Sequence, residues 1–382
     1  MSKERILIVN AIPLNNGDAA LVFSLYNRLI EKGHQVKIAT YYYDEVTKQY
    51  PKYPFVKELA QHKLFVKLPF LKFLLLPLFF YFSKAHREAT VIVGAPGGYV
   101  NSNYNIKSSL QVFGVAKFWN KKTAIYAQSV GPLNKKDKVY LTRLMQKSID
   151  YLMLRDGYSY KIAQELGVAK SKYNLTKDAA FLLQPTEQTN KQSNKIAISV
   201  REWGYDNRDR EQYINLIKAL TNTAIDKGYK VVFLSTCQGL AVYKNDALLA
   251  KEIILSLSKT QQNKVSLDDS YYTFDAFYKK FIAFDFIIGT RLHMCILAMT
   301  HYIPAFNISY EIKGKETYKY LNLEQYTIDY NAPIKESVLQ LKEFIANLPQ
   351  IKQHLEIQIP TVHTQVANDF EVFHKKIIAG YM

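Results

Sequence analysis

The chain has 382 residues, which is long for a single hydrophobic core, so two domains of ordinary size are expected. Hydrophobic residues make up 48% of it and charged residues 22%, a composition that excludes a disordered protein. The formal net charge of +17 favours an anionic partner, such as phosphate, an acidic membrane surface or nucleic acid. Nucleic acid is the least favoured, because no nucleic-acid-binding motif accompanies the charge.

The cysteines and the N-terminus favour the cytoplasm. Cys237 and Cys295 lie on apolar segments without a C-x-x-C pair, and a reducing compartment is the simpler expectation. No apolar region of the signal-peptide kind precedes the first expected strand. The sequence also lacks a visible cluster of metal ligands, so neither a metal nor a cofactor is expected.

The first 40 residues predict the start of a Rossmann-like domain. Residues 6–10 form an apolar run typical of a buried strand, residues 19–31 predict a helix, and residues 36–39 predict the next strand. The loop between strand and helix, Asn15-Asn-Gly-Asp18, lacks G-x-G-x-x-G, so no dinucleotide site is expected. Asp18 falls in the first helical turn, where the helix dipole favours a carboxylate. A capping role and a catalytic role are equally open for it.

Residues 63–88 interrupt this alternation of strands and helices. They are dense in Leu and Phe, are broken by Pro77, and carry lysines at both ends and within. Their longest uncharged part, residues 73–82, is about half the length that a bilayer crossing requires. The pattern favours a segment lying in a membrane interface, with its lysines toward acidic headgroups, over the alternative of two core helices.

Glycines and polar residues follow the other strands expected in this half. Ligands bind at the carboxyl ends of the strands in open α/β sheets, so these residues are candidates for a ligand site. They are Gly97-Gly98 after the strand at 91–94, Gln128-Ser129 after the strand at 123–127, and Arg155-Asp156 after the strand at 151–154.

A second α/β series follows a polar stretch, residues 185–194, that predicts a linker. We expect an α/β fold of two Rossmann-like domains in a GT-B-type architecture with an interdomain cleft. The expected domains are residues 1–184 and 195–355, followed by a helical tail over residues 356–382. In the second half, strands are expected at 195–200, 231–236, 284–288 and 304–308, and helices at 211–227, 246–257, 273–282, 336–346 and 366–378.

The stretch after the strand at 284–288 carries two basic residues where local propensity does not favour them. Thr290 is expected to cap a helix, which puts Arg291 and His293 in the first helical turn. A cation there opposes the helix dipole, whereas an anion would be bound well by the unpaired N–H groups. The alternative is that Arg291 pairs with a nearby carboxylate and His293 only packs.

Seven motifs follow one another at the ends of the expected elements. They are Asn15-x-Gly17-Asp18, Gly97-Gly98, Gln128-Ser-Val-Gly-Pro132, Arg155-Asp156-x-x-Ser159, Asp178-x-Ala180-Phe181, Ser199-Val-Arg201 and Thr290-Arg-Leu-His293. Each is weak alone, but this ordered set resembles the polysaccharide pyruvyltransferase family from about residue 6 to about residue 315. The resemblance implies a GT-B-type fold and transfer of the enolpyruvyl moiety of phosphoenolpyruvate to a sugar. Most members form a pyruvate ketal on two hydroxyls of a cell-surface glycan unit.

The resemblance also implies roles for individual residues. Arg201, Arg291 and His293 would hold phosphoenolpyruvate, and the Asn15–Asp18 loop would face the acceptor. From the chemistry of the residues themselves, His293 and Asp18 are the expected catalytic residues. A third glycine is often found after Gly97-Gly98, and Tyr99 replaces it here; this tyrosine would narrow the loop or stack on a sugar. The expected acceptor-binding residues are Asn15, Asn16, Gly17, Asp18, Gly97, Gly98, Tyr99, Gln128 and Ser129.

The chemistry of the donor agrees with these roles. Phosphoenolpyruvate carries a carboxylate and a phosphate, and both suit the planar fork of a guanidinium group. Ketal formation needs a proton on the methylene carbon, which an imidazolium near neutral pH can deliver. One difficulty is that positions i and i+2 of a helix point apart, so Arg291 and His293 converge only if Arg291 is not yet helical.

The expected function is therefore 4,6-ketal pyruvylation of a hexose, with galactose chosen by analogy. The acceptor would be an undecaprenyl-diphosphate-linked oligosaccharide for capsule or exopolysaccharide, reached by peripheral association with the inner face of the cytoplasmic membrane. One alternative is a GT-B nucleotide-sugar glycosyltransferase, for which Glu311 is a candidate ribose-binding residue. The other is a non-catalytic protein that docks polysaccharide enzymes at the membrane.

Overall fold

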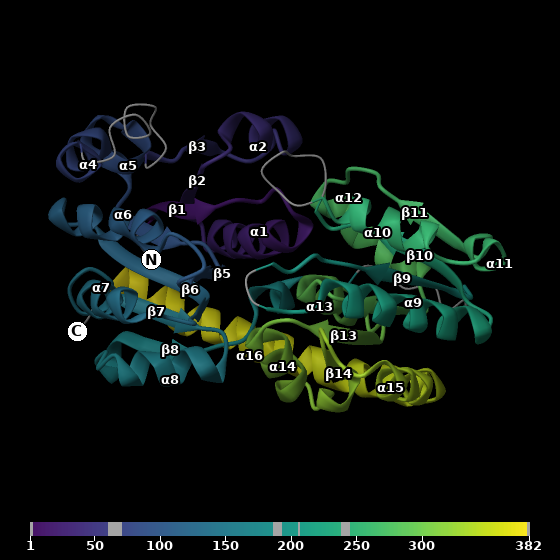
Figure 1. Cartoon of the computed structure of the whole chain (residues 1–382). Coiled ribbons are helices and arrows are strands. Elements are labelled where there is room, and N and C mark those ends of the chain that lie inside the picture. Colours follow the sequence, from purple (N-terminus) through teal and green to yellow (C-terminus); the bar gives the residue numbers. More distant parts are fainter. Residues whose placement is uncertain (1–2, 60–70, 186–192, 205–206, 238–244, 380–382) are drawn as a thin grey trace. The chain divides into compact units, whose positions relative to one another are not determined.

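The computed structural model describes the chain except for residues 1–2, 60–70, 186–192, 205–206, 238–244 and 380–382. It divides into two compact units, each built around a parallel sheet with helices packed against it (Figure 1). The first unit contains residues 1–14, 18–182 and the chain from Thr364 onward, and the second contains residues 15–17 and 183–363. The predicted α/β fold with two Rossmann-like parts is confirmed.

The sheet of the first unit has the strand order β3-β2-β1-β4-β6-β7-β8, with β5 also paired to β6. Its inner strand β1 is buried from Ile6 to Ala11, as expected for a parallel sheet covered on both faces. Ile6 pairs with Val36 of β2 and with Val91 of β4, which fixes the register at the centre. The strands are β1 (Arg5–Ala11), β2 (Gln35–Thr40), β3 (Phe55–Lys57), β4 (Val91–Gly94), β5 (Gly97–Val100), β6 (Lys122–Val130), β7 (Tyr151–Leu154) and β8 (Tyr173–Leu175).

Side-chain caps start several helices of this unit. Asn105, Asn134 and Asp156 each accept a hydrogen bond from the backbone N–H three residues further on, which satisfies one of the free N–H groups of a helix start. The helices are α1 (Asn16–Glu31), α2 (Tyr43–Gln49), α4 (Leu71–Phe82), α5 (Lys84–Glu88), α6 (Ile106–Phe118), α7 (Lys135–Lys147) and α8 (Gly157–Glu165).

The sheet of the second unit has the order β11-β10-β9-β12-β13-β14. Numbered from its own first strand, this is 3-2-1-4-5-6, the order of a Rossmann sheet. Every pair in it is parallel. The strands are β9 (Lys195–Ser199), β10 (Lys230–Leu234), β11 (Val265–Asp268), β12 (Phe286–Gly289), β13 (Ala305–Ser309) and β14 (Thr327–Asp329).

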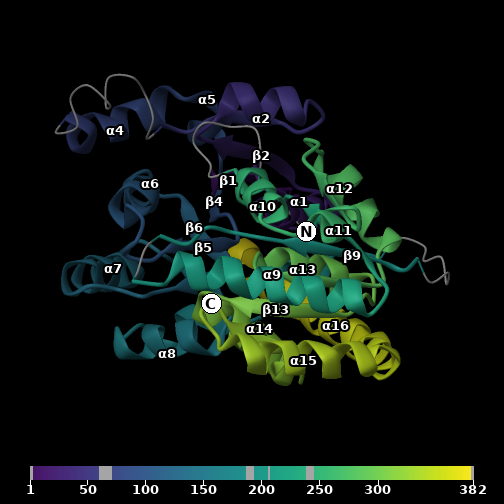
Figure 2. The same ribbon diagram turned by 45° about the vertical axis from the view of Figure 1, so that its right-hand side comes forward.

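The helices of the second unit connect these strands and continue beyond them (Figures 1 and 2). They are α9 (Arg210–Asp226), α10 (Asp246–Leu255), α11 (Lys259–Gln262), α12 (Phe274–Lys280), α13 (Leu292–Thr300), α14 (Ile312–Tyr320), α15 (Ile334–Ala346) and α16 (Leu348–Ala379). Most of the expected linker, residues 186–192, lies outside the described residues.

The C-terminal helix α16 is longer than the sequence predicts. It begins at Leu348, not near residue 366, and continues through Pro360 for 32 residues. From Thr364 onward it belongs to the first unit, where Phe373 packs against Tyr126 with ring centroids 4.8 Å apart. There His374 also contacts His34, with the two Nε2 atoms 2.7 Å apart, and burial lowers the pKa of both imidazoles.

The segment over residues 63–88 is described only from Leu71 onward. It folds into α4 and α5, with Phe80 and His86 buried. Within the described residues, no helix combines the length and the apolar character that a membrane span requires.

Candidate functional site

The candidate site lies at the point in the second sheet where the strand order reverses, between β9 and β12. In open α/β sheets the connections leave such neighbouring strands toward opposite faces, and a ligand-binding crevice opens at their carboxyl ends. Ser199, which ends β9, pairs with Gly289, which ends β12. Arg201 and Arg291 each follow two residues after this pair, so both predicted donor-binding arginines come from the carboxyl ends of adjacent strands.

Arg291 lies before the first turn of α13, not inside it. Its backbone is extended (φ −78°, ψ 110°) and occupies the N-cap position without a side-chain cap. The expectation that Thr290 caps this helix is therefore wrong: the Thr290 hydroxyl instead shares a 2.6 Å hydrogen bond with the Tyr213 hydroxyl. Because Arg291 is not helical, the divergence expected for helical positions two residues apart does not apply to Arg291 and His293.

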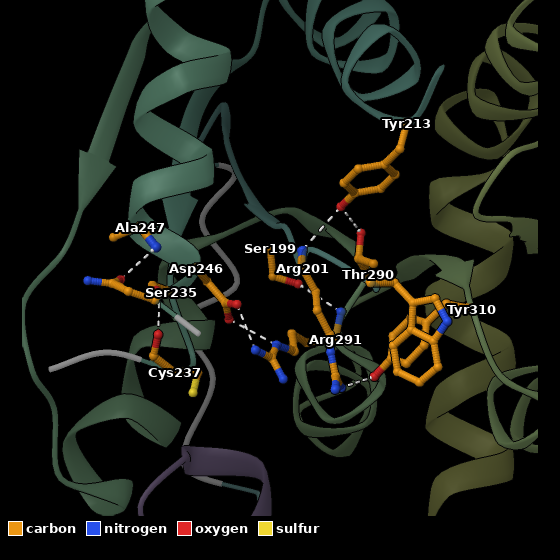
Figure 3. A network of polar contacts seen from close by, with 12 residues as sticks. Ser199, Arg201, Tyr213, Ser235, Cys237, Asp246, Ala247, Thr290, Arg291 and Tyr310 are labelled. Carbon is orange, nitrogen blue, oxygen red and sulfur yellow. Dashed lines mark hydrogen bonds and ion pairs between the residues drawn. The ribbon is translucent and has the colours of Figure 1, made fainter. Parts of the chain in front are cut away.

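The Arg291 side chain is bound by a carboxylate that the sequence did not identify. Its Nε and Nη2 atoms donate to the two oxygens of Asp246, the first residue of α10, over 2.9 and 2.6 Å (Figure 3). Burial raises the pKa of Asp246, while Arg291 and then Arg201 act to lower it. Burial alone would lower the pKa of Arg291, but Asp246 holds it above its usual range. Both arginines therefore lie within electrostatic range of one buried carboxylate.

Arg201 is held between aromatic rings. Its guanidinium carbon lies 5.1 Å from the Trp203 ring centroid and 4.7 Å from that of Tyr310, and its Nη1 donates to the Tyr310 hydroxyl (Figure 3). Such cation–π contacts fix a guanidinium without neutralising its charge. Arg201 is thus a positioned cation at the carboxyl end of β9.

Tyr213 ties the two strand ends together. Its hydroxyl accepts a 3.2 Å hydrogen bond from the Arg201 backbone N–H (Figure 3). The same hydroxyl forms the 2.6 Å hydrogen bond with the Thr290 hydroxyl. The Tyr213 ring is fully buried and stacks on Tyr330, with centroids 4.0 Å apart, and burial raises the pKa of its hydroxyl. This neutral hydroxyl links the backbone of Arg201 to the residue that precedes Arg291.

His293 lies in the first turn of α13 and is half-buried between the fully buried residues that anchor the helix. Gly289 allows α13 to start close to β12, because a Cβ at this position would collide with the sulfur of Cys295. The structure therefore places Arg201, Arg291 and His293 in one unit, at the ends of β9 and β12.

Two of the predicted acceptor-binding residues are engaged inside the first unit. Gln128 and Ser129 are buried, and the Ser129 hydroxyl donates to Asp156 at 2.6 Å while accepting from Arg155 Nε at 2.6 Å. Arg155 also forms a buried ion pair with Asp178 over 2.7 Å. These contacts give the motif a structural role, and its assignment to the acceptor stays a prediction.

The remaining predicted residues lie at other strand ends. Gly97, Gly98 and Tyr99 belong to β5, and the Tyr99 hydroxyl is buried close to Gly94. Asp18 lies in the first turn of α1 and groups with the first unit, whereas residues 15–17 group with the second.

Sequence reasoning missed the residues that hold the arginines. Asp246 is 45 residues from Arg291, and Tyr213 is 77 residues from Thr290, to which it is hydrogen-bonded. No local sequence pattern connects either residue to the arginines. The sequence indicated Glu311 but not its neighbour Tyr310, and Glu311 here forms a 2.6 Å ion pair with Lys313. Among the described residues, no group of three or more His, Cys, Asp or Glu side chains lies close enough together to hold a metal ion.

Known structures share the fold of this chain at low sequence identity. A glycosyltransferase from Rickettsia africae has a TM-score of 0.64 and 15% identity, with all of both chains covered. The Anabaena protein Alr3699/HepE in complex with UDP-glucose has a TM-score of 0.61 and 9% identity, covering 96% of this chain and 98% of that one. At such identities the likeness shows the fold alone, because one fold hosts many functions.

Comparison with known sequences identifies the family, which the structural similarities do not. The amylovoran biosynthesis protein AmsJ of Erwinia amylovora is 26% identical over 257 residues, which are 62% of this chain and 60% of the length of AmsJ. Residues 15–312 match the family described as polysaccharide pyruvyl transferase. The matched range contains Asp18, Arg201, Arg291 and His293, and it covers most of both sheets. The chain therefore belongs to the polysaccharide pyruvyl transferase family.

Proposed function

We propose that the protein transfers the pyruvyl group of phosphoenolpyruvate to a hexose of a lipid-linked oligosaccharide, forming a 4,6-pyruvate ketal during capsular or exopolysaccharide biosynthesis. Galactose is the proposed hexose. The observation that carries the proposal is the pairing of Ser199 with Gly289, which brings Arg201 and Arg291 to adjacent strand ends with His293 in the turn that follows. Family membership and the relative AmsJ support the choice of reaction and of product class.

The two arginines suit a donor with two anionic groups. Phosphoenolpyruvate presents a carboxylate and a phosphate on neighbouring atoms, and guanidinium groups bind both through paired N–H donors. Arg201 provides a cation fixed by Trp203 and Tyr310. Arg291 provides a second, whose Nη1 atom lies outside its contact with Asp246.

The reaction requires one proton donor and consumes two sugar hydroxyls. In our proposal His293 protonates the methylene carbon of phosphoenolpyruvate, which makes the adjacent carbon cationic, and one sugar hydroxyl adds to that carbon. The carbon–oxygen bond to phosphate then breaks, and the second hydroxyl adds in its place. One hydroxyl proton passes to a general base and the other to the leaving phosphate. The products are the ketal and inorganic phosphate. No metal or cofactor enters these steps.

The acceptor is proposed to bind through the residues that the family resemblance indicates, with Asp18 as the base that accepts a hydroxyl proton. The N-terminal turn of α1 is suited to this, since Asp18 is partly exposed there. Gly97 and Gly98 allow close backbone approach. Tyr99 is a less suitable sugar platform than the sequence alone indicates, because its hydroxyl is buried.

Incubating the protein with phosphoenolpyruvate and a galactoside with free 4- and 6-hydroxyls tests the reaction. We expect release of inorganic phosphate and a ketal resonance in the NMR spectrum of the sugar. Thermal denaturation with phosphoenolpyruvate beside UDP- and GDP-sugars tests the donor. Stabilisation by a nucleotide sugar alone would indicate the glycosyltransferase alternative, and stabilisation by none would indicate a non-catalytic protein.

A surface of the first unit supports the proposed location at the membrane. Four large hydrophobic side chains are exposed on α4 and at the end of α6, and together we call them the aromatic patch: Leu78 (49% exposed), Tyr81 (44%), Phe82 (68%) and Phe118 (69%). The two helices contact each other and are neighbours in Figures 1 and 2. Phe118 lies outside the segment that the sequence indicated.

Trp119 makes the aromatic patch one continuous surface. Its indole N–H donates to the backbone oxygen of Pro77 at 3.1 Å, and its ring stacks on Tyr81 with centroids 5.2 Å apart. Basic residues accompany the patch: Lys84 is largely exposed, and Arg87 lies over the Tyr81 ring. Exposed aromatic rings beside lysine and arginine suit the boundary between acidic headgroups and acyl chains.

Co-sedimentation with liposomes containing an anionic phospholipid tests this location. The wild type should bind, and binding should weaken but persist in high salt, because salt screens only the electrostatic part. The triple variant Leu78→Ser, Phe82→Ser, Phe118→Ser should not bind. The matched control exchanges equally exposed residues elsewhere: Val139→Ser, Leu339→Ser and Ile357→Ser. Equal liposome binding by both triple variants would place the membrane contact elsewhere on the protein. A wild type that does not bind liposomes would contradict the proposed location at the membrane.

A further inference from the structure

The contact between Asp246 and Arg291 differs from the other strong arginine–carboxylate pair on the same helix. Glu252, also on α10, binds Arg210 through both oxygens, and that pair is exposed at the surface. Asp246 is only 2% exposed and Arg291 only 14% exposed. One helix thus carries a buried pair at its first residue, beside the strand ends, and an exposed pair further along that uses Nη1 and Nη2 of its arginine.

The geometry of the buried pair leaves part of the guanidinium group outside it. A guanidinium has five N–H donors, and Asp246 accepts from Nε and Nη2. The edge formed by Nη1 and the second N–H of Nη2 therefore remains outside the pair. An anion bound at that edge would meet a guanidinium whose plane and direction are already fixed from the adjacent edge.

The carboxylate is itself fixed from several directions. It begins α10, where the helix dipole favours a negative charge, and the preceding residue Asn245 caps the helix through a hydrogen bond to the Ala247 N–H. The Asp246 backbone N–H also donates to the backbone oxygen of Cys237, which follows β10, at 3.2 Å. Asp246 is therefore connected to the carboxyl ends of β10 and β12, beside the point where the strand order reverses.

Stability alone does not account for a buried pair at this position. The cost of removing two charges from water roughly cancels their attraction, so a buried ion pair contributes little net stability. A carboxylate beside an anion site also repels the anion. The Asp246 carboxylate must therefore bring an advantage that exceeds this repulsion. Holding the Arg291 guanidinium in a fixed orientation is such an advantage.

We propose that Asp246 is a positioning residue, which holds Arg291 so that the Nη1–Nη2 edge of the guanidinium receives one anionic group of the donor. This inference rests on the proposed function, because it assigns the anion to phosphoenolpyruvate. Asp246 does not touch the donor and acts only through Arg291.

The direction in which the affinity for phosphoenolpyruvate changes in Asp246→Asn separates a positioning role from a general electrostatic one. In Asp246→Asn a negative charge near the anion is lost, so Coulomb attraction alone predicts tighter binding of phosphoenolpyruvate. Loss of positioning predicts weaker binding. We expect the dissociation constant, measured by calorimetry on the full chain, to rise at least tenfold in Asp246→Asn and further in Asp246→Ala. Glu252→Gln, the control on the same helix, should leave it unchanged.

A double-variant comparison tests whether Asp246 acts through Arg291. In the Arg291→Ala background, Asp246→Asn should change the dissociation constant by less than about twofold, because the group it positions is gone. Tighter or unchanged binding in Asp246→Asn overturns the inference while leaving the proposed function intact. Equal weakening in both backgrounds also overturns it, by showing a structural effect independent of Arg291. A wild type that does not bind phosphoenolpyruvate overturns the proposed function and this role with it.

Discussion

The buried ion pair between Arg155 and Asp178 gives a quantitative prediction about the first unit. Both side chains are almost completely buried, and the shortest nitrogen–oxygen distance is 2.7 Å. Asp178 also accepts a 3.0 Å hydrogen bond from the Ala180 N–H. Replacing one partner leaves the other charge buried, which costs about 3–5 kcal/mol. Asp178→Leu and Arg155→Met should each lower the free energy of unfolding of this unit by about that amount.

The double variant Arg155→Met, Asp178→Leu should be more stable than either single variant, because no unpaired charge remains. Urea unfolding followed by fluorescence measures this directly. The chain has two tryptophans, Trp119 in the first unit and Trp203 in the second, so a Trp203→Phe background reports the first unit alone. A loss below about 1 kcal/mol in the single variants, or additive losses in the double variant, would refute the reasoning.

Three further predictions concern individual side chains. Tyr213→Phe keeps the stack on Tyr330 but leaves the Arg201 N–H without its acceptor, so urea unfolding should show a loss of about 1–3 kcal/mol. His293→Gln should reduce turnover on the order of 100-fold with little change in donor affinity in steady-state kinetics, and a change in affinity alone would make His293 a binding residue. Burial lowers the pKa of His86 to about 3 in the folded protein. As the pH falls below about 6.5, this histidine is therefore protonated in the unfolded chain but not in the folded one. Roughly 2 kcal/mol of stability should be lost between pH 7.5 and pH 5. The free energy of unfolding of His86→Asn, measured at both pH values, should lack that part of the loss. A loss identical to that of the wild type would show that His86 is not its source.

The elements with strong local patterns could be predicted from the sequence. Buried parallel strands are continuous apolar runs, and β1, β6, β9 and β12 were found on that basis. The ends of these strands then indicated Arg201 and Arg291, because parallel strands bring their carboxyl ends to one edge of a sheet. The shortest strands, such as β3 and β14 with three residues each, are too short for a periodic pattern and were missed.

Features that depend on distant partners could not be predicted. Thr290 has the residue type of a helix cap, but the Tyr213 hydroxyl competes for it, and the helix begins later. Pro360 normally ends a helix because it lacks an N–H and clashes with the preceding turn, yet α16 continues through it. Ile359 and Val362, on either side of Pro360, are buried, and burial of apolar side chains favours the helical arrangement despite the proline.

The central claim is that Arg201 and Arg291 bind phosphoenolpyruvate, and calorimetric titration of the wild type and the two alanine variants tests it most directly. We predict that the wild type binds phosphoenolpyruvate and does not bind UDP-glucose. Each variant should lose roughly 2–4 kcal/mol of binding free energy, because a charge-assisted fork is removed and its anion is left unpaired. Unchanged affinity in both variants, or binding of UDP-glucose in place of phosphoenolpyruvate, would contradict the account.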